Sequence, residues 1–391
     1  MIPRHAKETA LRLAHGFPIL AITGPRQSGK TTLARAIFAD RPYVTLEDPD
    51  QRELALADPR GFLARFPDGA VIDEAQHGPE LMSYLQGLVD HRGRMGDFVL
   101  TGSQQFGLMS RISQSLAGRV GRIELLPFSI AELADADLLP SNLDTLLWRG
   151  GFPPLYDRPL LLPDDWFPNY IATYLERDVR QLLAVRDLAL FQRFVRLCAA
   201  RTGQLLNLSA LANDCGISHT TAREWLSVLE ASYLILLLPP YHRNFGKRLV
   251  KTPKLYFLDT GLAAALVGIK DSAALNIHPQ RGALFETLAV SEFVKQRFNN
   301  GRPADLYFWR DNTGHEIDLL FEIGGRLQGI EIKSGATLVR EWLKGLTKWQ
   351  TLAGEQALPG WLIYGGDEAY SREGIEVFDW RSLGEAARRN G

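Results

Sequence analysis

Residues 24–31 read Gly-Pro-Arg-Gln-Ser-Gly-Lys-Thr and satisfy the pattern G-x-x-x-x-G-K-[ST] at every fixed position. The octet lies between an apolar stretch, residues 18–23, and a stretch with helical character, residues 31–38. In that context the glycines let backbone amides converge on a phosphate, and the N-terminus of the helix adds its dipole. The octet therefore predicts a phosphate-binding loop in a parallel α/β sheet.

Each position of this loop has an expected role in binding ATP and Mg²⁺. Lys30 is expected to reach the β- and γ-phosphates, and the hydroxyl of Thr31 to bind the magnesium ion. The residues expected to contact the nucleotide are Gly24, Pro25, Arg26, Gln27, Ser28, Gly29, Lys30, Thr31 and Thr32. The alternative is a glycine turn followed by a surface lysine.

Polar side chains follow two later apolar runs. Asp73 and Glu74 follow the run 70–72, and we expect Asp73 to hold magnesium through water and Glu74 to polarise the attacking water. The next run ends in Ser103, Gln104 and Gln105. These residues fit a polar sensor of the γ-phosphate, with Ser103 the catalytic candidate, or alternatively a plain Gly-Ser turn.

Three arginines are candidates for a finger that a neighbouring subunit inserts into the ATP site: Arg111, Arg119 and Arg122. We favour Arg119, although each arginine also fits a surface or structural role. An arginine supplied by a neighbour predicts a homo-oligomer, and a hexameric ring is one such form.

The 391 residues exceed one ordinary hydrophobic core, so several domains are expected. Changes in the period of the apolar residues predict an ATPase core over 1–138 and a helical lid with a winged-helix-like region over 139–270. A second α/β module is expected over 271–391, where helical and strand-like runs alternate again.

The charge, the cysteines and the apolar runs of the chain indicate the compartment in which the protein is found. The formal net charge of −1 excludes a surface that is basic all over. Cys198 and Cys215 lack zinc spacing and indicate buried thiols in a reducing compartment. The most apolar run, residues 233–241, is too short to span a bilayer. We therefore expect a cytoplasmic protein without a membrane segment.

Residues 207–241 fit a helix, a turn at 214–217 and a second helix capped by Ser218. Thr220, Thr221 and Arg223 would lie on the outer face of the second helix, where a DNA-reading helix-turn-helix makes its contacts. The following segment, a candidate wing, is locally basic, with His242, Arg243, Lys247, Arg248, Lys251 and Lys254. The alternative is a lid or a protein-contact module.

Residues 315–335 fit a β-hairpin with Gly324 and Gly325 as its turn. Paired residues then have numbers that sum to 649, so Asp318 lies opposite Glu331. Alternation of side chains puts four charged residues on one face: Glu316, Asp318, Glu331 and Lys333. The other face is apolar and carries Ile317, Leu319, Phe321, Ile330 and Ile332.

Neighbouring carboxylates are costly unless a cation lies between them, and a divalent metal is one such cation. Lys333 would then orient or help to deprotonate a water for phosphodiester attack. This layout resembles the nuclease core of the PD-(D/E)xK superfamily, without the proline that often precedes the aspartate. The resemblance implies a glutamate on the preceding helix, where Glu286 lies, and a second Mg²⁺ or Mn²⁺ site at Glu286, Asp318 and Glu331. The alternatives are a charged surface hairpin and a non-cutting DNA-binding module.

Two further segments carry a family resemblance: SLAGRVGRIELLPFSIAEL at 115–133 and RGGFPPLY at 149–156. With the phosphate loop and the acidic pair, they resemble bacterial and archaeal AAA+ ATPases of the AAA-14 type that carry a C-terminal domain of unknown function. The resemblance covers nearly the whole chain and implies ATP hydrolysis.

The expected fold class is α/β multidomain: an AAA+ P-loop NTPase parallel sheet, a helical or winged-helix middle and a restriction-endonuclease-like C-terminal domain. The expected function is ATP hydrolysis coupled to assembly or movement on DNA, including branched or damaged DNA. One alternative is a nucleotide-gated switch in signalling or defence whose C-terminal domain binds a partner without cleaving it. Another is a structural DNA-binding protein with a vestigial ATP site.

Overall fold

The structure is a computed structural model that describes residues 2–103, 116–175, 187–241 and 250–389. It divides into two compact units. The first unit comprises Met1–Phe128, Ala231–Tyr233 and Arg297–Pro303, and the second comprises Ser129–Glu230, Leu234–Gln296 and Ala304–Gly391. Within the described ranges, no helix combines the length and apolarity that crossing a membrane requires.

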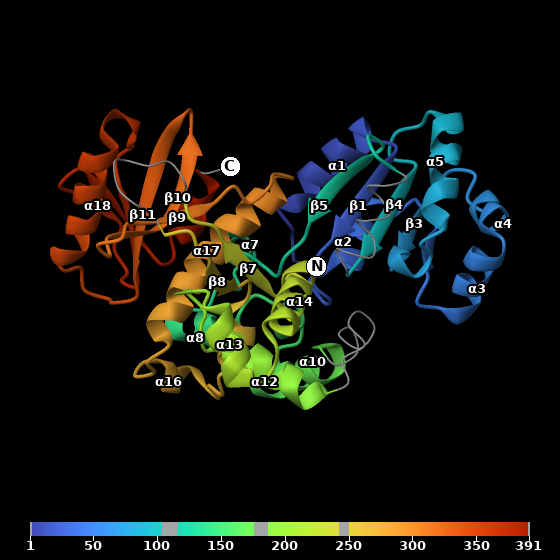
Figure 1. The fold of residues 1–391 in the computed structure, drawn as a ribbon. Helices are drawn as coiled ribbons and strands as arrows, with labels where there is room; N and C mark the ends of the chain where they lie inside the picture. The colour runs from blue at the N-terminus through green and yellow to red at the C-terminus, as the bar shows by residue number, and fades with distance from the viewer. Residues whose placement is uncertain (1, 104–115, 176–186, 242–249, 390–391) are drawn as a thin grey trace. The chain divides into compact units, whose positions relative to one another are not determined.

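The first unit contains a five-stranded sheet in the order β2-β3-β4-β1-β5, and every pair of neighbouring strands is parallel (Figure 1). Its strands are β1 (Ile19–Thr23), β2 (Tyr43–Thr45), β3 (Ala70–Asp73), β4 (Phe98–Gly102) and β5 (Val120–Glu124). Its helices are α1 (Ala6–Gly16), α2 (Lys30–Ile37), α3 (Pro49–Ala57), α4 (Pro59–Ala64) and α5 (Leu81–Arg92), with a short 3₁₀ helix η1 (Ala75–His77). The predicted parallel α/β sheet is confirmed.

The sheet of the first unit is covered on both faces. Ile19 and Ala21 of β1 belong to one buried cluster, whereas Leu20 and Ile22 belong to another. Because alternate residues of a strand point to opposite faces, apolar side chains are needed at every position. This explains why the strand appears in the sequence as an unbroken apolar run.

The middle of the chain forms helices and a small antiparallel sheet in the order β6-β8-β7. The helices before this region are α7 (Ile130–Asp135), α8 (Leu143–Arg149), α9 (Pro154–Asp157) and α10 (Pro163–Tyr170), followed by a π-helical turn η2 (Ile171–Leu175). Next come α12 (Leu188–Ala199), β6 (Gln204–Leu205), α13 (Leu208–Cys215), α14 (His219–Ala231), β7 (Ile235–Leu238) and β8 (Lys254–Phe257), and then α15 (Thr260–Leu266) and α16 (Ser272–Leu275).

The turn between α13 and α14 follows the predicted local chemistry. Gly216 ends α13 in the left-handed conformation, with φ 77°. The Ser218 hydroxyl accepts a hydrogen bond from the Thr221 amide at 3.0 Å, as expected of an N-terminal cap. Trp225 packs edge-on against Phe191 and Phe194 of α12, so the three helices share one core.

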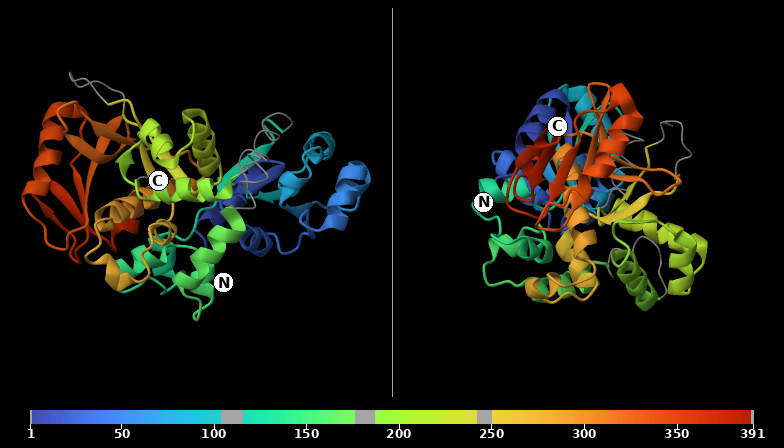
Figure 2. Two further views of the ribbon diagram at one scale, coloured as in Figure 1. Left: turned by 60° about the horizontal axis from the view of Figure 1, so that its bottom comes forward. Right: turned by 90° about the vertical axis from the view of Figure 1, so that its left-hand side faces the viewer.

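The C-terminal part contains a mixed six-stranded sheet in the order β13-β14-β12-β11-β10-β9. Its elements are α17 (Arg281–Asn299), β9 (Tyr307–Arg310), β10 (Glu316–Ile323), β11 (Arg326–Lys333), α18 (Glu341–Ala353), the 3₁₀ helix η3 (Gly354–Gln356), β12 (Trp361–Tyr364), β13 (Tyr370–Arg372), β14 (Ile375–Asp379) and α19 (Leu383–Arg388). Helices α17 and α18 lie against opposite faces of this sheet (Figures 1 and 2). The chain is thus an α/β protein of several domains.

The register of the hairpin formed by β10 and β11 is the predicted one. Leu319 pairs with Ile330 and Ile323 with Arg326, and both pairs of numbers sum to 649. Gly324 and Gly325 form the turn with φ of 57° and 79°, values that glycine adopts readily.

The predicted division into one charged face and one apolar face is wrong, because a bulge interrupts β10. The pairing of β10 with β9 shifts between Ile317 and Leu320, so both residues join the core around Trp349 of α18. Phe321 packs instead against Phe293 of α17, with ring centroids 5.6 Å apart. Each face of the sheet therefore has its own apolar layer, and the charged residues gather where β10 and β11 separate.

Candidate functional site

The phosphate loop follows β1 directly and ends where α2 begins. Gly24 has φ 149°, and a Cβ atom there would come within 2.1 Å of the Leu125 carbonyl oxygen. Gly29 has φ 92° and caps the N-terminus of α2, where Lys30 is the first helical residue. Both fixed glycines of the pattern therefore have a steric reason, and the loop lies at the carboxyl edge of the parallel sheet.

Two cations contact the backbone of the loop. Lys30 is buried and donates to the Pro25 carbonyl oxygen at 2.7 Å, so its ammonium lies across the loop. Arg4 donates to the carbonyl oxygens of Ser28 at 2.7 Å and Leu126 at 2.6 Å. The role of Arg4 in shaping the loop is not evident from the sequence, because nothing in the first residues marks a long-range contact.

Asp73 lies at the end of β3 and is the centre of a hydroxyl network. Its Oδ1 accepts hydrogen bonds from Thr31 at 2.9 Å and from Thr101, and its Oδ2 accepts from Tyr43 at 2.8 Å. Burial, together with the hydrogen bond to Asp73, raises the pKa of Tyr43 to about 12, so the phenol remains a donor. The structure thus brings together Thr31 and Asp73, the two residues predicted to hold Mg²⁺.

Glu74 and Ser103 also meet. The Ser103 hydroxyl donates to Oε2 of Glu74 at 3.2 Å, and the Gln76 amide donates to the same oxygen. Glu74 has φ 52°, a left-handed conformation that is uncommon for a residue with a side chain and is concentrated at functional sites. Gln76 is a contact that sequence reasoning missed. Gln104 and Gln105 lie outside the described residues.

The loop fits the phosphate chain of ATP and its magnesium ion. The hydroxyl of Ser28 is buried and has no hydrogen-bond partner among the described residues, so it is available to a ligand. When bound, Mg²⁺ neutralises charge that develops on the phosphates, and Thr31 and Asp73 are the residues positioned to hold it. Of the other loop residues, Arg26 lies 3.5 Å from Glu47, Gln27 has φ 58° and Thr32 is exposed.

The arginine candidates occupy different positions. Arg119 precedes β5, at the opposite edge of the sheet from the phosphate loop of its own chain, and binds both oxygens of Asp90 at 2.6 and 2.8 Å. Arg122 lies within β5 and pairs with Glu124 at 3.5 Å. Arg111 lies outside the described residues.

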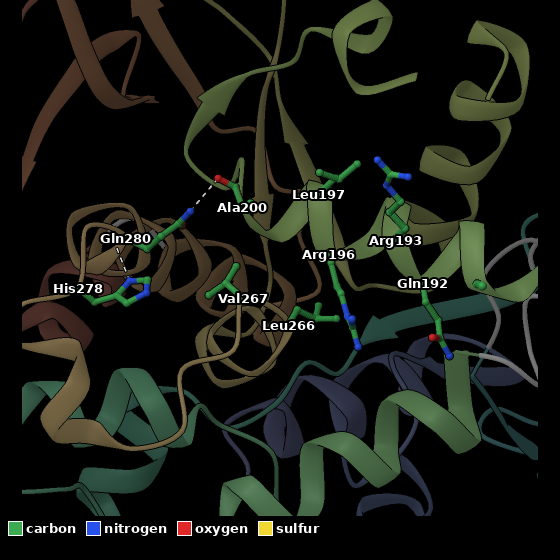
Figure 3. A pocket seen from close by; sticks show the side chains of 10 residues that line it. Gln192, Arg193, Arg196, Leu197, Ala200, Leu266, Val267, His278 and Gln280 are labelled. Atoms are coloured by element: carbon green, nitrogen blue, oxygen red, sulfur yellow. Dashed lines mark hydrogen bonds between the residues drawn. The ribbon is translucent and has the colours of Figure 1, made fainter. Parts of the chain in front are cut away.

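Two basic features lie on the middle helices. Thr220 and Arg223 are exposed on α14 and Thr221 is partly exposed, as predicted. Arg193 and Arg196, one turn apart on α12, line an open hollow of about 690 Å³ whose other wall carries His278 and Gln280 (Figure 3). Of the basic wing residues, Lys251 is exposed and Lys254 is buried, and the other four lie outside the described residues.

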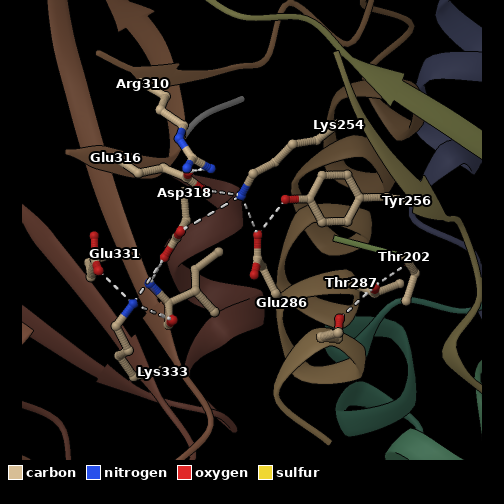
Figure 4. Close-up of polar contacts among 12 residues, drawn as sticks. Thr202, Lys254, Tyr256, Glu286, Thr287, Arg310, Glu316, Asp318, Glu331 and Lys333 are labelled. Atoms are coloured by element: carbon tan, nitrogen blue, oxygen red, sulfur yellow. Dashed lines mark hydrogen bonds and ion pairs between the residues drawn. The ribbon is translucent and has the colours of Figure 1, made fainter. Parts of the chain in front are cut away.

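A cluster of acidic residues forms where α17 faces the open end of the hairpin (Figure 4). Oxygen atoms of Glu286, Glu316 and Asp318 lie within 4.8 Å of one another, a spacing that suits a shared cation. Asp318 also accepts a hydrogen bond from the Ile332 amide at 2.8 Å, which fixes its carboxylate between the separating strands. Glu286 and Asp318 were predicted to lie together at a metal site, whereas Glu316 was not predicted to belong to the metal-binding group.

Glu331 and Lys333 border this cluster. Lys333 lies 3.4 Å from Asp318 and also pairs with Glu331, so it connects the two carboxylates. Glu331 lies outside the group of three, beside Gly345 of α18. Burial and the charge of Asp318 raise the pKa of Glu331 to about 8. The predicted metal set of Glu286, Asp318 and Glu331 is therefore not gathered around one point.

A second cation of the cluster is Lys254, from β8. Its ammonium lies 2.9 Å from Oε1 of Glu286, pairs with Glu316 and lies 4.0 Å from Oδ1 of Asp318. The Tyr256 hydroxyl donates to the same oxygen of Glu286. Burial alone lowers the pKa of Lys254, but the carboxylates outweigh it and the net shift is upward.

Comparison with known proteins identifies three regions. An AAA domain matches residues 16–134, and two domains of unknown function, DUF8612 and DUF4143, match residues 140–273 and 281–383. The uncharacterized proteins Rv2008c of Mycobacterium tuberculosis and Mb2031c of Mycobacterium bovis are each 35% identical to this chain over 336 residues, covering 85% of it and 74% of their own length.

Solved structures are more distant. The Walker-type ATPase PABY2304 of Pyrococcus abyssi is 15% identical, with 68% of this chain and 96% of that chain covered and a TM-score of 0.48. The RuvB Holliday junction branch migration motor of Thermotoga maritima is 18% identical, with 61% and 90% covered and a TM-score of 0.30.

The parallel sheet, the phosphate loop and the matched AAA domain define an ATPase of the AAA+ type. ATP and Mg²⁺ are typical of such ATPases. The chain belongs to the same family as the mycobacterial proteins, a family of AAA-domain proteins with C-terminal domains of unknown function.

Proposed function

We propose that this AAA+ ATPase couples ATP hydrolysis to assembly or movement on DNA, and that its C-terminal domain carries a nuclease-like, divalent-metal site. We divide the chain into an ATPase core (1–138), a helical lid with a winged-helix-like region (139–270) and a nuclease-like domain (271–391). The observation that carries it is the meeting of Glu286, Glu316 and Asp318 beside Lys333. Three clustered carboxylates can hold a divalent metal, and a lysine beside them can orient the water for phosphodiester attack.

Within the ATPase core, we propose that Lys30 binds the phosphates and Glu74 polarises the attacking water, with Ser103 as sensor. Support comes from the contacts that hold Ser103 against Glu74 and Thr31 against Asp73. We also propose a homo-oligomer in which Arg119 reaches the ATP site of a neighbouring subunit. Arg119 must then release its hydrogen bonds to Asp90. Substituting Arg119 with alanine should then reduce ATP turnover while leaving nucleotide affinity unchanged.

Support for a DNA partner comes from the middle of the chain. A three-helix core with a β6-β8-β7 sheet is consistent with a winged-helix fold. Helix α14 presents Thr220, Thr221 and Arg223 to solvent. Cations next to hydroxyl groups are the usual contacts to a phosphate backbone. The exposed Arg193 and Arg196 extend the basic surface along α12.

DNA binding is tested by fluorescence anisotropy with duplex and branched oligonucleotides. Arg223→Ala should weaken binding and lower the salt slope by about one unit, the effect of losing one phosphate contact. Lys344→Ala, which removes an exposed cation on α18, is the matched control and should bind like the wild type. Equal loss in both variants would indicate a general charge effect and count against α14 as the contact.

Cleavage is tested on linear, single-stranded and branched DNA with Mg²⁺ or Mn²⁺. Asp318→Asn and Lys333→Met should abolish cutting while ATP hydrolysis persists, and Glu341→Gln, an exposed carboxylate of α18, should leave cutting unchanged. Absence of cleavage on every substrate would favour the second candidate function, a nucleotide-gated switch with a non-cleaving, partner-binding C-terminal domain. The position of Lys254 between the carboxylates is the observation that favours this second function.

A further inference from the structure

Lys254 is a buried cation on the middle strand of its sheet. Its exposed fraction is 3%, and β8 is paired on both sides, with Lys254 opposite Leu238 of β7 and Leu205 of β6. Tyr256 shares its face of the strand, since alternate residues point the same way, and also contacts Glu286. The strand therefore fixes the lysine and the tyrosine on the acidic cluster together (Figure 4).

The lysine ammonium lies among the carboxylates that would hold a metal. Magnesium binds oxygen atoms at about 2.1 Å, so two ligands on opposite sides of one ion are separated by roughly 4.2 Å. The oxygens of Glu286, Glu316 and Asp318 lie within 4.8 Å of one another, close to that spacing, and all three residues face the ammonium of Lys254. An ion at their centre and the ammonium cannot occupy this space together.

The cluster is also close to neutral without a metal. Its four carboxylates, Glu331 included, face three cations, since Arg310 lies 3.0 Å from Glu316 and Lys333 contacts Asp318 and Glu331. Glu286, Glu316 and Asp318 need a cation among them, and Lys254 supplies it. In this arrangement, little negative charge of the carboxylates is therefore left for a metal ion to neutralise.

We propose that Lys254 is a tethered cation that closes the metal position, an autoinhibitory contact, and that a divalent metal enters only when β8 withdraws. This inference rests on the proposed metal site. Because β8 pairs with β7, which follows α14, a shift of the proposed DNA-contacting helix would reach β8 through β7. The C-terminal domain would then bind metal only in an engaged state.

The test measures Mn²⁺ binding to the full chain without nucleotide, from the loss of the free Mn²⁺ signal in electron paramagnetic resonance. Lys254→Met should bind Mn²⁺ roughly tenfold or more tightly than the wild type. Arg310→Met removes a cation from Glu316 without vacating the position, so its affinity should stay close to that of the wild type. The double variant, with Asp318→Asn added to Lys254→Met, should lose the gain in Mn²⁺ affinity. Any Mn²⁺ that this double variant still binds is bound elsewhere on the chain.

Other outcomes separate the two proposals. If the wild type already binds as tightly as Lys254→Met, and Asp318→Asn abolishes both, the metal site stands and its closure by Lys254 is refuted. If Arg310→Met gains as much as Lys254→Met, charge and not position controls binding, which also overturns the closure. If no variant binds Mn²⁺, the metal site itself fails. Lys254→Gln retains a donor to Glu286 and serves if the methionine variant does not fold.

Discussion

Replacing Asp73 with asparagine keeps the size of the side chain and removes its charge. The carboxylate accepts three side-chain hydrogen bonds, from Thr31, Thr101 and Tyr43. An asparagine can accept from Thr31 and Thr101 through its carbonyl oxygen and donate to the Tyr43 oxygen, so the network can be retained. The change therefore tests charge more than shape.

The magnitude follows from those three bonds. A hydrogen bond to a charged group contributes about 1.5–3 kcal/mol and one to a neutral group about 0.5–1.5 kcal/mol, so each bond weakens by about 1 kcal/mol. The unfolding free energy should fall by about 1–3 kcal/mol, because the lower desolvation cost of asparagine offsets part of the loss. ATP turnover should fall roughly 100-fold or more, as expected when a group that positions charge at the phosphates is lost.

The assay compares three quantities in the wild type, Asp73→Asn and Tyr43→Phe: the free energy of unfolding in urea, Mg²⁺-dependent binding of a fluorescent ATP analogue, and ATP turnover. Tyr43→Phe removes one of the three bonds and leaves the carboxylate charged, so it should lose about 1.5–3 kcal/mol of unfolding free energy and keep most of its turnover. Wild-type turnover in Asp73→Asn would refute the assignment of Asp73 to the magnesium ion. Equal loss of turnover in both variants would assign the effect to the fold.

Three further predictions concern other parts of the chain. Gly24→Ala should abolish ATP binding measured by fluorescence titration, because a Cβ atom would come within 2.1 Å of a backbone oxygen; normal binding would contradict this. Tyr233→Phe removes a 2.8 Å hydrogen bond to Thr23, the residue before the phosphate loop. The free energy of unfolding, measured by urea titration, should fall by about 1 kcal/mol. An unchanged free energy of unfolding would contradict this prediction. Burial raises the thiol pKa of Cys198 and Cys215, so at about pH 8 neither should react with a thiol reagent until denaturant exposes both, and fast reaction of the native protein would be inconsistent with the structure.

Local patterns predicted the features that depend on neighbouring residues. The phosphate loop is such a feature, because its backbone needs a positive φ at Gly24 and Gly29, whereas the contact of Gly24 with Leu125 is distant and could not be predicted. The hairpin register is another, because the turn at Gly324 and Gly325 determines which residues pair. In both cases the predicted interactions lie within a few residues of the motif.

The sequence could not predict features that depend on distant contacts. The bulge in β10 is set by pairing with β9, and it brings Ile317 and Leu320 into one core, which strict alternation does not predict. Lys254 was expected on a basic wing, but the pairing of β8 and the packing against α17 bury it among carboxylates. Nothing in the segment around Lys254 distinguishes a buried ion pair from a solvated lysine.

The central claim, ATP hydrolysis coupled to DNA, is tested most directly by the steady-state ATPase rate of the full chain with and without linear duplex, single-stranded and branched DNA. We predict that at least one DNA raises the rate, and that Lys30→Ala abolishes hydrolysis both with and without DNA. A slow rate that no DNA changes would contradict the coupling and favour the nucleotide-gated switch.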